Sequence, residues 1–296
     1  MNTYHRFSLS KRGKHLCPQC EHKTFVLYID HATGQPLNEK CGKCDRANNC
    51  GYHYPPKQYF TDNKIPFAER EYKIIIPKPQ PKPNYIDLDF LQKSMKGYEN
   101  NSLVQFLVGR FGAEETHKAV ERYFIGTSNW NNATVFWQID RNNRIRTGKI
   151  MQYNAQTGKR IKEPISKITW VHSRLRINDF NLAQCLFGEH LLQDTTKIVA
   201  IVESEKTAII ASICLPEYIW LACGGLEQLS MEKCKCLYNR TVVLFPDLKG
   251  LEKWARKAFE LQLICRNVYV SDYLERYATD EEREQGLDIA DFLLKA

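Results

Sequence analysis

Two Cys-x-x-Cys pairs near the start of this 296-residue chain place the strongest constraint on what it can fold into. The pairs are Cys17-Pro-Gln-Cys20 and Cys41-Gly-Lys-Cys44, and the segment 23–30 between them, KTFVLYID, alternates like a strand. Each pair puts two thiolates on one tight turn, where Zn–S bonds of ~2.3 Å can form two corners of a tetrahedron. The pattern predicts a zinc ribbon over residues 1–60, in which structural zinc provides much of the folding free energy.

A fifth cysteine leaves the ligand set open at this point. Cys50 follows Cys44 in the string CDRANNCGYH, so Cys44 and Cys50 could supply the second pair and leave Cys41 free. His53 is a further candidate, although a lone histidine near a ribbon is more often a surface or packing residue. Four protein ligands would close the zinc shell and leave no place for a catalytic water.

The remaining six cysteines scatter from Cys185 to Cys265 and are expected to be small buried hydrophobes. A tight cysteine cluster in a reducing compartment indicates metal rather than disulfides. No apolar run approaches the ~18 residues of a membrane span, and the first residues lack a signal-peptide core. We therefore expect a soluble, cytoplasmic protein without a membrane partner.

Positive charge is concentrated in the front half of the chain. Residues 1–82 carry 14 basic and 7 acidic side chains, and residues 141–176 carry ten basic and one acidic. From residue 197 onward there are 13 basic and 16 acidic side chains. This asymmetry favours a polyanion that one part of the chain holds and another part processes.

Prolines mark a boundary after the ribbon. Residues 77, 79, 81 and 83 are prolines with lysines between them, which predicts an extended linker over 61–85. Beyond it, residues 86–125 have apolar side chains at helical spacing, and residues 133–153 alternate with period two around the turn-rich RNNR. We expect a mixed α+β domain over 86–184 that contains a hairpin.

The last third of the chain alternates short apolar runs with helical segments. The runs are KIVAIVE, YIWLACGG, RTVVLFPD and NVYVSDY, with helices expected at SEKTAIIASI, near 226–238 and near 250–264. This rhythm predicts parallel βαβ units and a Rossmann-like parallel sheet over 185–296. The fold class is therefore α/β, with a zinc ribbon in front.

Two acids stand where strands of that sheet end. Glu203 follows the first apolar run and Asp247 a later one, and the carboxyl ends of parallel strands line the crevice where ligands bind. Two carboxylates there suit Mg²⁺ or Mn²⁺ shared with phosphates. Gly224 and Gly225 would permit close backbone approach, and the two flanking lysines could contact phosphate oxygens; these are Lys206 and Lys249. The competing interpretation is that acids in such positions only cap helices.

Basic residues surround the expected hairpin and suit single-stranded nucleic acid, because cations follow phosphates while aromatic rings stack on bases. The rings would be Trp137 and Tyr153. The alternative is a solvated charged sheet face over core aromatics. The cations that we assign to binding are Arg144, Arg146, Lys149 and Arg160.

The order strand–Glu–helix, strand–GlyGly, strand–Asp–helix resembles the Toprim domain of bacterial-type primases, topoisomerases and related nucleases. VESEKTA is similar to the family's glutamate motif and PDLKG to its aspartate motif. The resemblance implies a general acid/base role for Glu203 and metal binding for Asp247. A zinc ribbon before a middle domain and a Toprim domain is also the primase order.

The chain most resembles zinc-ribbon/Toprim proteins of bacteroidete mobile elements, through strings in the same order along nearly its whole length: GTSNW, VFWQID, RTGKIMQYN, TWVHS, QCLFGEHLL and VESEKTAIIAS. Position 41 is often not cysteine in those relatives, which implies the ligand set Cys17, Cys20, Cys44 and Cys50. The resemblance implies a primase-like nucleotidyltransferase that uses single-stranded DNA or RNA and nucleoside triphosphates. No helicase P-loop is present in this sequence, so any replicative helicase would be a separate chain.

One position departs from the Toprim pattern. The aspartate motif normally reads Asp-x-Asp, and here its second acid is Lys249, which cannot bind a cation. Catalysis with one metal, recruitment of Glu205 or Glu252, and a site that only binds are the three outcomes. The third corresponds to an inactive DNA-binding accessory protein, and a Toprim nuclease would use the same carboxylates. Asp288 and Asp291 resemble the acidic tail of Toprim primase domains, although capping of the last helix is the simpler role.

Overall fold

The fold is taken from a computed structural model in which residues 6–11, 13–65, 82–162 and 168–295 are described. The chain forms two compact units, Met1–Gln80 and Pro81–Ala296. The central part of the predicted linker, residues 66–81, lies outside the described residues. Among the described residues, none of the helices combines the length and the apolar composition that a membrane span requires.

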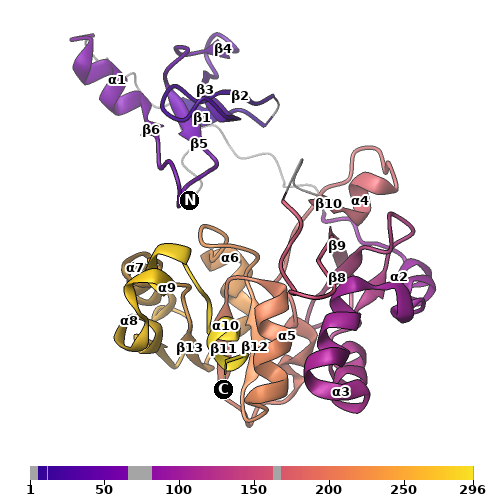
Figure 1. Cartoon of the computed structure of the whole chain (residues 1–296). Coiled ribbons are helices and arrows are strands. Elements are labelled where there is room, and N and C mark those ends of the chain that lie inside the picture. The colour runs from indigo at the N-terminus through magenta and orange to yellow at the C-terminus, as the bar shows by residue number, and fades with distance from the viewer. Residues whose placement is uncertain (1–5, 12, 66–81, 163–167, 296) are drawn as a thin grey trace. The chain divides into compact units, whose positions relative to one another are not determined.

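The first unit is an antiparallel sheet in the order β1-β3-β5-β6, and β2 and β4 also pair with β3 (Figure 1). The predicted strand KTFVLYID is β3, the centre of this sheet, and its Phe25 and Leu27 pack against Cys17 and Cys44. The apolar cluster that these four residues form is small, as expected of a domain whose folding depends on a bound metal. The elements are β1 (Phe7–Leu9), β2 (His15–Leu16), β3 (Lys23–Asp30), β4 (Gln35–Pro36), β5 (Gly42–Cys44), β6 (His53–Tyr54) and α1 (Pro56–Asp62).

The second unit opens with the predicted helical region and hairpin. An antiparallel sheet in the order β10-β9-β8-β7 contains the hairpin as β8 and β9. The long helix α3 is interrupted at Gly112, whose φ of 79° lies outside the helical region. The elements are α2 (Leu88–Ser94), η1 (Tyr98–Asn100), α3 (Ser102–Arg122), β7 (Gly126–Thr127), β8 (Thr134–Ile139), β9 (Ile145–Met151), β10 (Ile168–Trp170), α4 (Val171–Arg174) and η2 (Glu189–Gln193).

A four-stranded parallel sheet in the order β12-β11-β13-β14 follows, which confirms the predicted α/β class. β11 and β13, the strands that precede the two predicted acids, are direct neighbours. The elements are β11 (Val199–Val202), α5 (Glu205–Cys214), β12 (Ile219–Ala222), α6 (Met231–Cys234), η3 (Lys235–Leu237), β13 (Thr241–Leu244), α7 (Leu251–Leu261), β14 (Asn267–Val270), α8 (Tyr273–Tyr277), α9 (Asp280–Gln285) and α10 (Ile289–Leu293).

The helix expected near 226–238 is shorter than predicted. It begins only at Met231, because the Ser230 hydroxyl caps it by accepting the N–H of Lys233, and it tightens into a 3₁₀ turn after Cys234. After the two glycines, residues 226–227 form a turn instead, and residues 228–230 have no regular secondary structure.

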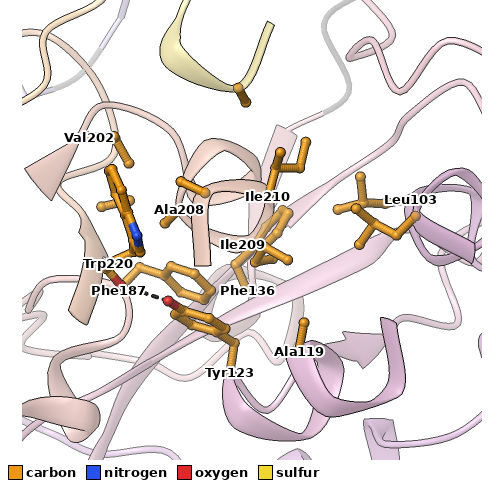
Figure 2. Packing of buried hydrophobic residues seen from close by; sticks show 14 of the residues in the cluster. Leu103, Ala119, Tyr123, Phe136, Phe187, Val202, Ala208, Ile209, Ile210 and Trp220 are labelled. Atoms are coloured by element: carbon orange, nitrogen blue, oxygen red, sulfur yellow. Dashed lines mark hydrogen bonds between the residues drawn. The ribbon is translucent and has the colours of Figure 1, made fainter. Parts of the chain in front are cut away.

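Both faces of the parallel sheet are buried, in separate apolar clusters. Ala200 and Val202 of β11 belong to one cluster, and Val199 and Ile201 belong to the other, as the two-residue strand period requires. The first cluster also takes in α3, α5 and the strand β8, so the middle segment and the parallel sheet share one core (Figure 2).

Tyr123 shows how closely the two parts of this unit fit together. Its hydroxyl, at the end of α3, donates to the Trp220 carbonyl on β12 at 2.9 Å, and its ring stacks on Phe187 with centroids 5.1 Å apart (Figure 2). Phe136 of β8 contacts the same Phe187 ring edge-on at 5.7 Å. The position of β8 and β9 against the parallel sheet is therefore fixed by packed aromatic side chains.

Candidate functional site

Four cysteines of the ribbon bring their sulfur atoms together. The Sγ atoms of Cys17, Cys20, Cys44 and Cys50 all lie within 4.8 Å of one another. Two of the separations are 3.7 Å, between Cys17 and Cys50, and 3.9 Å, between Cys20 and Cys44. A tetrahedron with Zn–S bonds of ~2.3 Å has sulfur–sulfur edges of about 3.8 Å, so the quartet fits structural zinc.

The other two ligand candidates lie outside this quartet. Cys41 is fully buried, and its sulfur is not among the four that come together. The His53 ring is hydrogen-bonded through Nε2 to the Tyr28 hydroxyl at 2.9 Å. Within the quartet, the backbone N–H of His22 lowers the pKa of Cys20 to about 6, whereas burial and hydrogen bonds to the other three sulfurs raise the pKa of Cys50.

The second group of side chains lies at the carboxyl ends of β11 and β13. Glu203 directly follows β11 and is 6% exposed, and Asp247 follows β13 by three residues. The backbone N–H of Asp247 hydrogen-bonds the Glu203 carboxylate. The two predicted acids are thus neighbours, as expected from adjacent parallel strands.

The acids disturb one another's ionisation. Burial raises the pKa of Glu203 to about 7, and the charge of Asp288 adds to this effect. Burial, followed by the charges of Glu203, Asp288 and Asp291, raises the pKa of Asp247 well above its usual range. Several carboxyl groups with raised pKa values in one place mark a site suited to proton transfer or to a cation.

Asp288 contributes to this group although its local role is that of a helix cap. It caps α10 together with Asp291, and its Oδ2 accepts the Thr207 hydroxyl at 2.6 Å. Burial raises the pKa of Asp288, and Lys206 opposes that rise, as it also does for Asp247. The charge of Lys206 therefore acts on both aspartates, whereas Lys253 lowers the pKa of Glu203.

The two glycines turn the chain beside the first acid. Gly224 and Gly225 have φ values of 95° and 143°, and the Gly224 N–H donates to the backbone carbonyl of Glu203 at 2.9 Å. A side chain at either position would force an unfavourable backbone conformation. The GlyGly turn therefore ties the end of β12 to the end of β11.

Lys149 reaches this turn from the hairpin and does not lie on the exposed basic surface. It is 8% exposed, and its Nζ lies 3.1 and 3.0 Å from the two carboxylate oxygens of Glu205 and 3.4 Å from the Gly224 carbonyl. This pairing engages Glu205, one of the two acids considered as a replacement metal ligand. The other, Glu252, pairs with Arg256 on an exposed face of α7.

Lys249 is held away from the acids. Its Nζ donates to the Glu284 carbonyl at 3.2 Å, and its N–H donates to Glu275 Oε1 at 3.1 Å. Its φ of 71° is unusual for a residue other than glycine. The side chain that replaces the second acid of the motif therefore ties the loop after β13 to the end of α9.

The hairpin differs from the sequence-based expectation in its aromatic residues. Trp137 is 2% exposed and its indole N–H donates to Ser94 Oγ, while Tyr153 is 5% exposed. Both rings belong to apolar clusters, so neither is open to a base. Of the assigned cations, Arg160 is exposed, whereas Arg144 and Arg146 are ion-paired with Asp140.

Three residues that border the GlyGly turn or contact the hairpin arginines were not singled out from the sequence. Lys233 of α6 donates to the Cys223 carbonyl at 3.2 Å, so a second lysine borders the GlyGly turn. Asp140 and Tyr85 contact the hairpin arginines. Asp140 could have been found, because an Asp at a strand end directly before the turn-rich RNNR is typical of a turn whose side chain bonds the backbone; nothing in the sequence pattern points to the other two.

Solved primase structures are similar to this chain at a low level. The primase fragment of the bacteriophage T7 primase-helicase has 14% identity and a TM-score of 0.40, covering 93% of this chain and 99% of that one. The Escherichia coli primase catalytic core has 12% identity and a TM-score of 0.41, with 70% and 81% covered. The RNA polymerase domain of Mycobacterium tuberculosis DnaG has 12% identity and a TM-score of 0.44, with 71% and 77% covered. All three TM-scores lie below 0.5.

Two family models match the sequence, whereas no curated protein does. A zinc beta-ribbon finger model matches residues 5–65, in agreement with the cysteine quartet. The other model, described as "Domain of unknown function (DUF6371)", matches residues 101–248, which is half of the chain and includes the hairpin, both glycines and both acids. The chain therefore belongs to the DUF6371 family, with a zinc ribbon in front of its family domain.

Proposed function

We propose that this protein is a primase-like, metal-dependent nucleotidyltransferase that acts on single-stranded DNA. The observation that carries the proposal is the Glu203–Asp247 pair at the carboxyl ends of two adjacent parallel strands, in which burial raises both pKa values and the charge of Glu203 raises that of Asp247 further. The motifs around the pair resemble those of Toprim domains, and the zinc ribbon precedes them in the primase order.

Glu203 is proposed as the general base that takes the proton of a primer 3′-hydroxyl. A base works best when its pKa lies near the working pH, and burial brings the Glu203 pKa to about 7. Lys206, whose charge lowers the pKa values of Asp247 and Asp288, is the proposed phosphate contact, and Gly224 and Gly225 allow a phosphate to approach the backbone. Lys249, held at the Glu284 carbonyl, is a weaker phosphate candidate.

Asp247 is proposed to hold Mg²⁺ or Mn²⁺, while Glu203 stays free to accept the proton. Within the described ranges the cysteine quartet is the one group of three or more close metal-ligating atoms, so the acids do not form a full cage. One carboxylate fits, because Mg²⁺ in nucleotide sites commonly takes one or two carboxylates and completes its shell with waters and substrate phosphates. The bound ion would supply positive charge against the triphosphate.

The ribbon and the basic hairpin are proposed to hold the nucleic acid. Arg144, Arg146 and Arg160 are the cations assigned to phosphate contacts, whereas Lys149 faces the GlyGly turn. DNA is the proposed template, with RNA as the alternative. By resemblance, the setting is replication of a mobile element in the bacterial cytoplasm, with any helicase supplied by another chain. The proposed divisions are residues 1–60, 61–85, 86–184 and 185–296.

A second candidate function follows from Lys249. A protein that kept the Toprim fold but lost the second acid of the motif could bind DNA as an accessory replication protein without catalysis. A nuclease is the third, since it would use the same carboxylates. Loss of DNA in Mg²⁺ without added nucleotides would identify the nuclease.

The test is primer synthesis on single-stranded DNA with labelled nucleotides and Mg²⁺ or Mn²⁺. We expect short labelled products from the wild type, and a loss of at least about a hundredfold in Glu203→Gln, as for removal of a general base. Asp247→Asn should also lose primer synthesis, and a change of pH should not restore it. If neither wild type nor variants make products while all bind DNA in a salt-sensitive way, the accessory-protein function replaces the proposed one.

A further inference from the structure

Two arginines on the hairpin share a single buried acceptor. The Nε atoms of Arg144 and Arg146 each donate to Oδ2 of Asp140 at 2.9 Å. Asp140 is 2% exposed, and its Oδ1 accepts the backbone N–H groups of Asn142 and Arg144 at 2.9 and 3.0 Å. One carboxylate, fixed by the turn, therefore determines where both guanidinium groups lie.

An aromatic ring supports the same two groups. The Cζ atoms of Arg144 and Arg146 lie 4.8 and 5.1 Å from the centroid of the Tyr85 ring. The next residue, Ile86, donates its N–H to the Ile145 carbonyl at 2.8 Å, so the ring is anchored to β9 between the two arginines. The two guanidinium groups share one carboxylate and one ring, so their like charges repel each other. The negative charge of Asp140 and the face of the Tyr85 ring offset that repulsion.

The arrangement leaves unused binding capacity on its outer side. Both arginines use Nε, and across the described ranges neither donates a hydrogen bond from an Nη nitrogen. The Arg144 side chain is 44% exposed and that of Arg146 is 16% exposed. Two positive charges against one negative charge leave a net charge of +1, and guanidinium edges match the spacing of phosphate oxygens.

We propose that Arg144 and Arg146, positioned by Asp140 and Tyr85, form a binding site for a phosphate group. Arg144 directly precedes β9 and Arg146 belongs to it, three residues or about 10 Å along the strand from Lys149, which reaches Glu205 and the GlyGly turn. That this phosphate belongs to a nucleic-acid strand or a nucleotide rests on the function proposed above.

We call this arrangement, in which Asp140 and Tyr85 hold Arg144 and Arg146, the arginine clamp. The clamp predicts a result that a diffuse positive surface does not predict. Asp140→Asn adds one positive charge, so a diffuse basic surface would bind a polyanion more tightly after this change. The clamp instead loses the charged acceptor that holds both arginines, so we expect affinity to fall about three- to tenfold. Arg144→Lys/Arg146→Lys, which keeps the charge but removes the planar forks, should weaken binding similarly.

The measurement is anisotropy of a labelled 20-nucleotide single strand without a terminal phosphate, titrated with the full-length zinc-loaded protein between 50 and 200 mM salt. Arg144→Gln/Arg146→Gln should reduce affinity at least tenfold and lower the salt slope by roughly 1 to 2, the value for two lost phosphate contacts. The matched control is Arg256→Gln/Arg276→Gln, two exposed arginines that are likewise paired with carboxylates, and it should change affinity less than twofold.

Competition identifies where the phosphate comes from. If an unlabelled strand displaces the labelled strand but ATP does not, the site binds the nucleic-acid backbone. If ATP displaces the labelled strand at a similar concentration, the site binds a nucleoside triphosphate. Unchanged or tighter binding by Asp140→Asn overturns the clamp. If that variant does not fold by thermal unfolding, Tyr85→Leu and the double lysine variant decide, since neither removes the buried carboxylate.

Primer synthesis on the same proteins separates this inference from the proposed function. A wild type that makes no primers, yet loses strand affinity through Asp140→Asn, would end the nucleotidyltransferase proposal and keep the phosphate site. A wild type that makes primers, while all hairpin variants bind the strand normally, would keep the nucleotidyltransferase proposal and end the phosphate site.

Discussion

The ammonium group of Lys149 lies 3.1 and 3.0 Å from the two oxygens of the Glu205 carboxylate, with side chains 11% and 2% exposed. The lysine comes from the hairpin strand β9 and the glutamate from the first turn of α5, 56 residues later. This buried pair therefore connects the antiparallel sheet to the helix that follows Glu203.

Removing one partner of the pair should be costly. Lys149→Met leaves the Glu205 carboxylate buried without a counter-charge, and we expect a loss of about 3–5 kcal/mol in the free energy of unfolding. Urea denaturation would measure it. Lys149→Met/Glu205→Met should be less destabilised than the single variant, whereas Lys118→Met, at an exposed pair, should change stability by less than about 1 kcal/mol. Equal losses in the single and double variants would contradict this account.

Stability should depend on pH through Glu203. Its pKa is about 7 in the folded protein against an ordinary value of 4.5, so between these values the folded state keeps a proton that the unfolded state has released. The Glu203 contribution to the free energy of unfolding should then fall as pH rises from about 4.5 to 7, by at most ~1.4 kcal/mol per pH unit, and level off above. Glu203→Gln should lose this contribution, whereas the part that comes from Asp247 and Asp288, whose pKa values are also raised, should remain. Chemical denaturation without added divalent cations, at pH 5, 6 and 8, would measure it, and parallel curves for both proteins would rule it out.

The two central cysteines of the ribbon should respond differently to substitution. Cys44→Ser removes a member of the sulfur quartet and should abolish the binding of one zinc per chain and unfold the ribbon. Cys41→Ser changes a buried thiol outside the quartet and should keep the zinc. Elemental analysis with circular dichroism would show the difference, and zinc loss in Cys41→Ser alone would reassign the ligands.

Lys249→Gly should not destabilise the protein. The residue has a φ of 71°, which glycine adopts without strain, and the relief should offset the loss of the bond to the Glu284 carbonyl. We expect a change between zero and a gain of about 1 kcal/mol in thermal unfolding. Lys249→Ala is the matched control, because it loses the same side chain but keeps the strain. Glycine and alanine variants of equal stability would show that the backbone conformation costs nothing.

Local patterns in the sequence predict most of the architecture. Strand periodicity identifies β3 and the β8–β9 hairpin, and the alternation of apolar runs with helical segments identifies the parallel sheet. The spacing of acids at strand ends places Glu203 beside Asp247 because neighbouring strands of a parallel sheet end at one edge. The structure further brings the predicted cysteine quartet together.

Side-chain partners from distant segments could not be predicted in this way. Lys149 reads as a surface cation in a basic string, and only the packing of β9 against the parallel sheet turns it inward to Glu205. Trp137 and Tyr153 read as stacking rings for the same reason, although tertiary contacts bury them. Periodicity reports which side of an element is apolar, but it does not report which neighbour covers that side.

The aromatic contact of Tyr123 with Phe187 and Trp220 has a consequence for how this protein can be divided. The core that contains these rings draws on α3, β8, α5 and β12, so a cut between the hairpin region and the parallel sheet would expose large apolar surfaces on both fragments. Neither half should be obtainable as a stable, separately expressed domain. The shared core should also limit recombination between related genes. We expect recombination to exchange the ribbon as a module and to keep the rest of the chain together.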